Sequence, residues 1–382
     1  MAPDSEYIPF MPPPPIDAQL GNVLAAQAST RARIDAVRRN IVRMRFLLHG
    51  RKPQTATRWR IFRRSVLSLL AMLLALAIVQ SEAWAQSPLP QGLPDGAAAQ
   101  LQEWLQGSPT APKRGVLYEV RSGSNTVYLY GTIHLGRADF YPMNAAIPRA
   151  VAASSQVYLE TDIADPAAAT SMATAERYPS GVTLDKKIPP TLMTKVETIF
   201  ARYGVTRQEI NGKRPWALAN DLLTRKATEM GYDPMFAPDI YLASIAQLLG
   251  KQTSGLESID EQIQVFKGMS EDEQRAYLED AVSSLESGRL GTVLQASVDA
   301  WSSGGAAAIG AALQKERDDE SIALRETMRR LLDDRNVRMA ERIDSIARSG
   351  PSAFVAVGAA HLVGRGSVVE LLRKKGLSLR EL

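Results

Sequence analysis

Alternating apolar and polar residues mark two neighbouring strands at the start of the expected folded region. The segments are "GVLYEVRSG", from Gly115, and "NTVYLYGT", from Asn125, with a turn around Gly123 between them. Their period of two is typical of half-buried strands. A helix is then predicted near residues 145–154, and "SQVYLETD" predicts a third short strand that ends in Glu160.

The middle of the chain follows a different pattern. From about residue 190 to residue 347 the apolar positions recur mostly at helical spacing, with strand-like pieces such as "KQTSGLES" between helices. Strand signals return in "SAFVAVGAAH", and "GSVVELLRKKG" predicts a closing helix. We therefore expect an α/β fold, bordering on α+β, whose central sheet combines N-terminal and C-terminal strands around a large helical insertion.

Residues 58–85 have the pattern of a secretory signal peptide. A basic cluster precedes an apolar run from Val66 to Val79, and Ala83-Trp84-Ala85 follows as a small-x-small cleavage site. A spanning helix needs roughly 20 apolar residues, more than this run provides. We expect cleavage near Ala85, a periplasmic or secreted protein, and no permanent membrane span after cleavage.

The segments on either side of the signal have little to form a core. Residues 1–57 are first Pro-rich and then basic, which indicates a disordered extension or an over-long gene model with true initiation at Met44. A real cytoplasmic extension is the alternative. Residues 86–112 are rich in Pro, Gly, Ala and Gln and are expected to be a linker, so the folded domain is expected at 113–382.

Removing the signal changes the charge of the protein. Residues 1–85 hold 12 of the 45 basic residues and five of the 41 acidic ones, which leaves 33 basic against 36 acidic and a net charge of about −3. This balance gives no support to nucleic-acid binding, and we expect none. The chain has no cysteine, which excludes disulfides and thiolate metal sites.

Two of the three histidines share one local sequence frame. "VYLYGTIHLGRADF" contains His134 and "FVAVGAAHLVGRG" contains His361, and each joins an apolar run to Gly-x-x-His, Leu and a further Gly. Gly131 and Gly358 open the two motifs and would permit a tight turn and close backbone approach. If the two apolar runs are adjacent strands, both imidazoles reach the same edge of the sheet.

Functional groups in an open α/β sheet collect beyond the carboxyl ends of the strands. Glu160 would add a carboxylate at that edge. Two imidazoles and a carboxylate suit a divalent metal, and zinc, manganese, cobalt and iron all remain candidates. The alternative is that His134 and His361 only cap helices or fill turns.

Several further motifs follow in a fixed order. They are "YLYGTIHLGRADFYP", "VYLETD", "RPWALA", "GYDPMF", "SGLESIDEQ", "LLDDRN" and "FVAVGAAHLVGRGSVVELLRKKG". In this order, from about Gly115 to Leu382, the chain resembles the TraB/PrgY/GumN family, to which the TIKI-type metalloproteases are related. The resemblance implies a metal-dependent site with His134, His361 and Glu160.

The resemblance also implies a role for the "DDRN" motif. Its Arg335 would hold a substrate carboxylate or stabilise a developing oxyanion, while the alternative is an ion pair on a helix surface. The next residue, Asn336, is a candidate for the surroundings of the site. Glu257 in "GLES" is either a further site carboxylate or a buried acid paired with Arg335, and Trp216 in "RPWALA" is expected in the core.

Together these features favour an exported metal-dependent hydrolase, with peptides or proteins as substrates. Glu160 would be a metal ligand or the base that activates water, with Arg335 steadying substrate charge. The chain lacks His-Glu-x-x-His, the motif that places two ligands and a base on one helix in many zinc proteases. A non-catalytic periplasmic binding or accessory protein, linked to polysaccharide export or peptide signalling, is the alternative, and the oligomeric state is left open.

Overall fold

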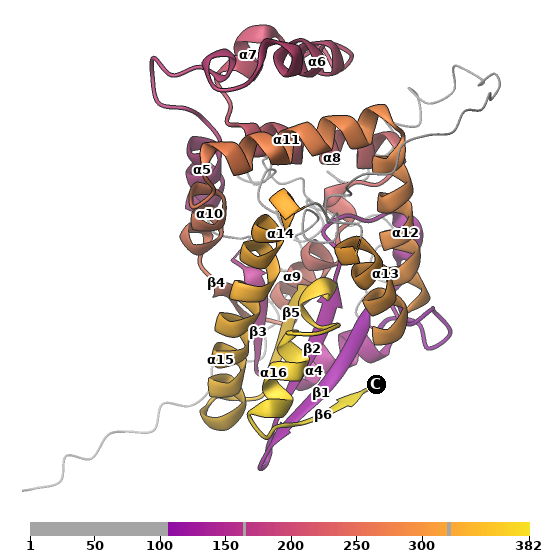
Figure 1. The fold of residues 1–382 in the computed structure, drawn as a ribbon. Coiled ribbons are helices and arrows are strands. Elements are labelled where there is room, and N and C mark those ends of the chain that lie inside the picture. The colour runs from indigo at the N-terminus through magenta and orange to yellow at the C-terminus, as the bar shows by residue number, and fades with distance from the viewer. Residues whose placement is uncertain (1–105, 163–165, 319–321) are drawn as a thin grey trace, which may run out of the picture. The chain divides into compact units, whose positions relative to one another are not determined.

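The computed structural model describes residues 106–162, 166–318 and 322–382 (Figure 1). The expected signal peptide and the extension before it lie outside these ranges, as does most of the expected linker. The last part of that linker touches the domain: the Ser108 amide donates to the Met143 carbonyl at 2.9 Å. Within the described ranges, no helix is both long and apolar enough to cross a membrane.

A six-stranded mixed sheet lies at the centre of this part of the chain, in the order β4-β3-β5-β2-β1-β6. The strands β4, β3, β5 and β2 run parallel, whereas β1 is antiparallel to both β2 and β6. Their bounds are β1 (Val116–Ser122), β2 (Asn125–Thr132), β3 (Gln156–Thr161), β4 (Gln252–Glu257), β5 (Ala353–Gly358) and β6 (Ser378–Glu381).

The C-terminal strand β5 lies between two N-terminal strands. It pairs in parallel with β2, with Thr132 opposite Gly358, and with β3, with Leu159 opposite Ala356. Every residue of β5 is buried, as its unbroken apolar sequence "AFVAVG" predicts for a central parallel strand covered on both faces. The expected α/β fold, with a sheet shared by both ends of the domain, is therefore confirmed.

Two edge strands complete the sheet. The segment "KQTSGLES" supplies β4, which pairs in parallel with β3 beyond the shared strands. The strand β6 follows the last helix and pairs with β1, which the sequence analysis did not predict. With only four residues, most of them polar and not buried, β6 carries little of the apolar alternation by which a strand is recognised.

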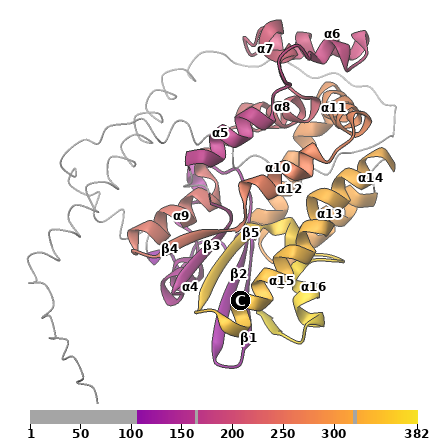
Figure 2. The ribbon, with the colours of Figure 1, turned by 90° about the vertical axis from the view of Figure 1, so that its left-hand side faces the viewer.

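Helices cover both faces of the sheet (Figure 2). In that view α4 and α9 lie on one side, and α15 and α16 lie on the other. Contacts agree, because α4 and α9 pack on β5 while α15 packs on β1 and β2. These four helices are α4 (Ala146–Ala153), α9 (Pro238–Leu248), α15 (Asp334–Ser349) and α16 (Val368–Lys374).

The insertion between β3 and β5 is mostly helical, as predicted. Its Trp216 is 1% exposed and stacks on Phe266 with 4.4 Å between ring centroids, which places it in the core. The remaining helices are α5 (Pro166–Ala175), α6 (Pro190–Ala201), α7 (Arg207–Asn211), α8 (Pro215–Glu229), α10 (Ile259–Lys267), α11 (Glu271–Glu286), α12 (Arg289–Ser303), α13 (Ala306–Asp318) and α14 (Ile322–Met328). Short 3-10 helices are η3 (Ala138–Phe140), η4 (Leu184–Lys186), η5 (Pro234–Phe236) and η7 (Ala359–His361), and η6 (Arg329–Asp333) is a π-helix.

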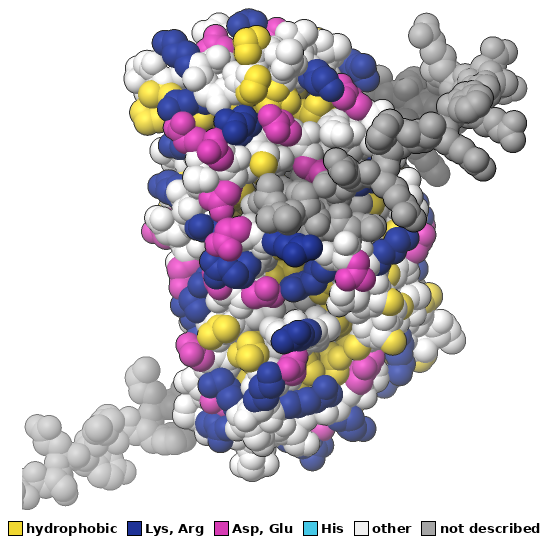
Figure 3. All heavy atoms as spheres, viewed as in Figure 1, with side chains coloured by type: hydrophobic (Ala, Val, Ile, Leu, Met, Phe, Trp, Pro, Cys, Tyr) yellow, Lys and Arg dark blue, Asp and Glu magenta, His cyan; other side chains and the backbone are white. Residues whose placement is uncertain are grey.

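Basic and acidic side chains are interspersed on the face drawn in Figure 3, and no histidine is visible among its described residues. Both histidines of the described chain are buried, with exposed fractions of 2% for His134 and 0% for His361. The paired imidazoles therefore belong to the interior and not to the outer surface.

Candidate functional site

The carboxyl ends of β2, β3, β4 and β5 meet at one edge of the sheet, because these four strands run parallel in adjacent positions. The last residue of β2, Thr132, pairs with the last residue of β5, and Thr161 at the end of β3 pairs with Glu257 at the end of β4. This register delivers His134, His361 and two glutamates to the same edge, as expected for the functional edge of such a sheet.

His134 is held by a carboxylate from the helical insertion. Its Nδ1 lies 2.8 Å from Oδ2 of Asp239, in the first turn of α9. The other oxygen of Asp239 accepts a hydrogen bond from the Thr132 hydroxyl at 2.7 Å. A carboxylate can only accept here, so Nδ1 of His134 carries the hydrogen.

His361 is held in the same manner by an amide. Its Nδ1 lies 2.6 Å from Oδ1 of Asn336, near the start of α15, and Nδ2 of Asn336 donates to the Gly366 carbonyl at 3.0 Å. The second contact orients the amide, because only its nitrogen can donate to a carbonyl. The Nδ1 atom of His361 is therefore a donor, and its Nε2 keeps a free lone pair when the ring is neutral.

Glu160 lies at the centre of the hydrogen-bonding network. Its Oε2 accepts from the Gly358 amide at 2.9 Å, which ties β3 to the turn before His361. Its Oε1 accepts from Nε2 of Gln262 at 3.2 Å and from Nη2 of Arg335. The carboxylate is 4% exposed, so these donors replace the water that it lost on burial.

Arg335 joins two buried carboxylates. Besides the contact with Glu160, its Nε and Nη2 donate to Oε2 of Glu257 at 2.8 and 2.6 Å. Its Nη1 donates to the Leu331 carbonyl, inside the π-helix η6, at 3.2 Å. Arg335 is 3% exposed, so the alternative of an ion pair on a helix surface is wrong, and Glu257 is the buried acid paired with it.

The glycines of the two motifs contribute in different ways. A Cβ on Gly131 would lie 2.9 Å from Cγ1 of Val116 and 3.0 Å from Cα of Ala359, so a larger residue would push the turn that carries His361 away from β2. Gly136, the second glycine of the first motif, has no room for a Cβ beside the Phe236 carbonyl. Gly358 has a φ of −52°, which any residue can adopt, and it contributes its N–H to Glu160.

The two imidazoles differ in protonation. Burial disfavours a charge on His134, but Asp239 and Glu160 outweigh this effect and raise its pKa to about 10. Burial and then Arg335 lower the pKa of His361 to about 3. Burial would raise the pKa of Glu160, yet Arg335 and His134 hold it well below its usual range. These shifts favour a charged His134 beside a charged Glu160, and a neutral His361.

The unsatisfied atoms of the site suit a metal ion. Within the described chain, Nε2 of His134 and Nε2 of His361 are both buried without a hydrogen-bond partner. Nε2 of His134 lies 3.6 Å from Oε2 of Glu160, too long for a hydrogen bond. Two ligands about 2.1 Å from one tetrahedral ion are separated by roughly 3.4 Å, close to that spacing.

The three side chains do not form a complete set of metal ligands in their present arrangement. In the described ranges no group of three or more His, Asp or Glu side chains is arranged to hold a metal ion as it stands. Glu160 already accepts three hydrogen bonds, although each of its oxygens has two lone pairs. The spacing therefore suits Nε2 of His134 and Oε2 of Glu160 as two ligands of one ion, and the unpartnered Nε2 of His361 would supply the third bond.

Sequence reasoning missed Asp239 and Gln262. Asp239 follows Pro238 at the start of α9, where an acidic residue is an ordinary helix-terminus preference and gives no functional signal. Gln262 lies in the first turns of α10, within the motif "SGLESIDEQ", where only Glu257 was considered as a site residue. Both come from the helical insertion, so only the folded chain brings them to the site.

Comparison with known proteins agrees with this architecture. A sequence model described as the TraB/PrgY/gumN family matches residues 116–381, from the first residue of β1 to the last residue of β6. The match therefore contains every strand of the sheet and every residue of the candidate site. No solved structure gives a significant match.

Curated relatives are similar at low identity. Metalloprotease TIKI1 of Danio rerio is 25% identical over 295 residues, which cover 65% of this chain and 59% of the relative. The metalloprotease TIKI homolog of Nematostella vectensis is 25% identical, with 65% and 63% covered. The uncharacterized protein YbaP of Escherichia coli is 23% identical, with 66% and 89% covered. The chain thus spans about three fifths of the metalloprotease relatives and most of YbaP.

Proposed function

Because the chain belongs to the TraB/PrgY/gumN family, we propose that it is an exported metal-dependent hydrolase that acts on peptide bonds. The relatives named as metalloproteases make the family metalloprotease-like at a distance. The proposal for this chain depends on its own residues, since the shared identity is low and the match leaves part of those relatives uncovered.

One observation carries the proposal. Two buried imidazoles each have Nδ1 fixed by an acceptor, Asp239 for His134 and Asn336 for His361, and each has Nε2 without a partner among the described residues. This is how metal-binding histidines are commonly oriented, because the acceptor that contacts Nδ1 fixes the tautomer and the ring plane. A divalent ion held there would polarise the scissile carbonyl and lower the pKa of an attacking water.

The surroundings of Glu160 favour one of its two possible roles. A general base works best when its pKa lies near the operating pH, but Arg335 and His134 hold the pKa of this carboxyl well below its usual range despite burial. Glu160 is therefore better suited to charge stabilisation and ion binding than to accepting a proton. Its tie to the Gly358 amide also fixes the start of the motif that carries His361.

Arg335 would act mainly by holding the two glutamates in place. Its nitrogens are engaged by Glu160, Glu257 and the Leu331 carbonyl. Because these contacts use most of its N–H donors, Arg335 has few left to bind a substrate. We therefore assign it a positioning role and not direct contact with substrate charge. Arg338, whose Nη2 lies 3.5 Å from Oε1 of Glu257, extends the network toward solvent.

Export is the second part of the proposal. It rests on the basic cluster, apolar run and Ala-Trp-Ala of residues 58–85, which lie outside the described ranges. We propose a periplasmic or secreted location after cleavage near Ala85. The absence of cysteine throughout the chain is compatible with such a compartment but does not require it.

A binding or accessory role without catalysis is the alternative, and burial favours it. His134, His361 and Glu160 are at most 4% exposed, so a substrate reaches them only after local opening. The charged His134, Glu160 and Arg335 also form an internally paired network that would persist without an ion. In this alternative the network holds the sheet edge together, and a peptide or polysaccharide ligand binds elsewhere on the same face.

The deciding experiment combines elemental analysis with a peptide-library cleavage assay. We expect about one equivalent of zinc, manganese, cobalt or iron in the parent protein, and loss of both metal and cleavage in His134→Ala and His361→Ala. A chelator should lower the melting temperature of the parent but not of these variants, because an ion bound only to the folded state stabilises it. Metal-free protein that cleaves no peptide but binds one would support the accessory role.

A further inference from the structure

A second feature of the insertion shares helix α10 with the candidate site. Helices α5 and α10 border a pocket of about 760 Å³, within the range of small-ligand sites. α5 follows β3 and α10 follows β4, so both helices start at the sheet edge where Glu160 and Glu257 lie. On α10 the positions 260, 263 and 267 line the pocket at the three- and four-residue spacing of one helix face.

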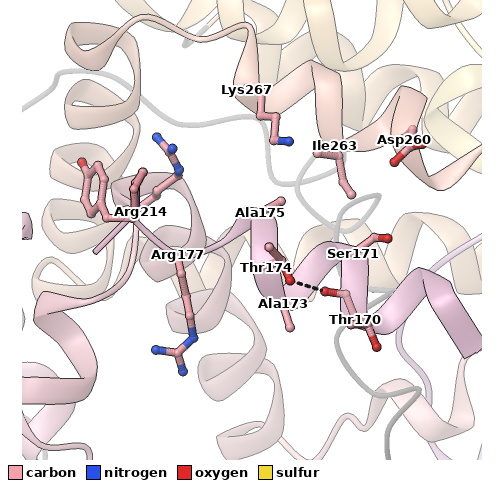
Figure 4. Close-up of a pocket in the computed structure, with 12 residues that line it drawn as sticks. Thr170, Ser171, Ala173, Thr174, Ala175, Arg177, Arg214, Asp260, Ile263 and Lys267 are labelled. Carbon is pink, nitrogen blue, oxygen red and sulfur yellow. Dashed lines mark hydrogen bonds between the residues drawn. The ribbon is translucent and has the colours of Figure 1, made fainter. Parts of the chain in front are cut away.

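The pocket has a cationic end. Arg214 and Lys267 both line it, and neither has a carboxylate partner among the described residues. In Figure 4 their side-chain nitrogens lie on one side of the end of α5, while Arg177 extends to the other side. Asp260 lies at the far end of α10 from Lys267 in the same view.

Arg214 is prepared to bind an anion. Its guanidinium carbon lies over the Tyr178 ring, 5.0 Å from the ring centroid, a cation–π contact that helps to hold the group in place. Its buried Nε has no hydrogen-bond partner in the described chain. The planar fork of a guanidinium matches the geometry of a carboxylate, and a nearby ammonium adds charge.

The pocket is coupled to the site through one helix. Gln262 of α10 donates to Oε1 of Glu160 at 3.2 Å, and its neighbour Ile263 is 2% exposed and lines the pocket. The pocket and the candidate site therefore share α10, with neighbouring residues of that helix facing each of them. The hydroxyls of Thr170 and Ser171 on α5 offer further polar contacts there, whereas the Thr174 hydroxyl already donates to the Thr170 carbonyl at 2.8 Å.

We propose that Arg214 and Lys267 form a subsite for a carboxylate of the peptide substrate, either an acidic side chain or the C-terminal carboxylate. The subsite selects anionic substrates and rests on the proposed peptidase function. Its ligand chemistry follows from two unpaired cations, a guanidinium held over the Tyr178 ring and neighbouring hydroxyls, and not from the metal chemistry of the histidines.

Fluorescence anisotropy with three labelled peptides tests this inference. The first peptide carries one Glu and an amidated C-terminus, the second has Gln in place of that Glu, and the third is the Gln peptide with a free C-terminal carboxylate. We expect the parent protein to bind the first or third peptide about tenfold more tightly than the second. The preferred peptide identifies the source of the carboxylate.

Lys267→Gln should remove that preference, with about tenfold weaker binding of the preferred peptide, and Lys267→Arg should restore it. Lys315→Gln is the matched control, because Lys315 is an exposed lysine on α13 away from the pocket. Equal binding of all three peptides by the parent, no binding of any of them, or equal effects of Lys267→Gln and Lys315→Gln would overturn the proposal. Mass spectrometry of the recovered peptides keeps binding separate from cleavage, so a missing hydrolase activity counts against the proposed function alone.

Discussion

Asn336 fixes His361 in one orientation, with 2.6 Å between the amide Oδ1 and the ring Nδ1 and 3.0 Å between the amide Nδ2 and the Gly366 carbonyl. Together these contacts assign the hydrogen to Nδ1 and leave Nε2 as the atom available to a metal ion. These two hydrogen bonds join α15 to the turn after β5, and their effect on metal affinity can be measured.

Asn336→Ala should weaken zinc binding by about 10–100-fold, the usual effect of losing a group that orients a metal-binding histidine. Competition with a chelating dye measures this change. Asn125→Ala is the control, because its side chain donates to the carbonyls of Ile346, Ala347 and Gly350 near the start of β2. Unchanged zinc affinity in Asn336→Ala would exclude a ligand role for His361.

Glu160→Gln and Glu257→Gln form a matched pair. Both remove a buried carboxylate that accepts from Arg335, so each should lower the free energy of unfolding by roughly 1–3 kcal/mol, measured by urea denaturation. Only Glu160 lies near Nε2 of His134, so only Glu160→Gln should abolish metal-dependent cleavage. Equal loss of activity in the two variants would mean that the network acts through stability alone.

Glu261 makes the stability of the fold depend on pH in the acidic range. The hydrogen bonds from Arg342 lower its pKa from 4.5 to about 2, although partial burial opposes the shift. A carboxyl whose folded pKa is depressed stabilises the protein above its unfolded pKa, and this contribution is lost as pH falls from about 4.5 toward 2. Glu261→Gln should therefore flatten this part of the stability–pH curve, measured by thermal unfolding.

The effect should be modest because both partners are partly exposed. Glu197→Gln is a suitable comparison, since Glu197 pairs with Arg207 on the surface and has no capping role. Glu261 also closes the capping box at Ser258, so its loss should loosen the start of α10. A stability–pH curve identical to that of the parent would contradict the assignment.

Protein recovered from cells should begin at or near Gln86. The basic cluster, apolar run and Ala83-Trp84-Ala85 provide the reason, because signal peptidases cleave after such small residues. Intact-mass measurement of the recovered protein identifies its first residue. Retention of residues before Ala83 would argue against cleavage at this position.

The strand pairing was predictable because the sequence carries its own signal. Two apolar runs followed by Gly-x-x-His predict equivalent positions beyond two strands, and β2 and β5 are indeed adjacent and parallel. The interior position of Arg335 was expected only from the family resemblance and not from the local pattern, because a charged residue on an amphipathic helix usually faces solvent. Its two carboxylate partners come from β3 and β4, and no local pattern links them.

The residues that hydrogen-bond to the two histidines and to Glu160 also differ in how well the sequence predicts them. Asn336 stands in a recognisable motif beside Arg335, and it was a candidate for that reason. Asp239 and Gln262 could not be assigned, because each fits an ordinary helix-start pattern and its contact spans about a hundred residues of sequence. The short strand β6 was missed for lack of apolar alternation.

The position of β5 between β2 and β3 has a consequence for the order of folding. Of the four parallel strands, β5 is made last, after the entire helical insertion, so β3 and β4 cannot join β2 until residues 353–358 are present. Contacts this distant in sequence form slowly, because the chain must close a long loop before they stabilise it. A chain that crosses a membrane N-terminus first would thus complete its sheet only after nearly all of its residues have emerged. Chaperones that bind the unpaired edges of β2 and β3 until then would set the yield of folded protein.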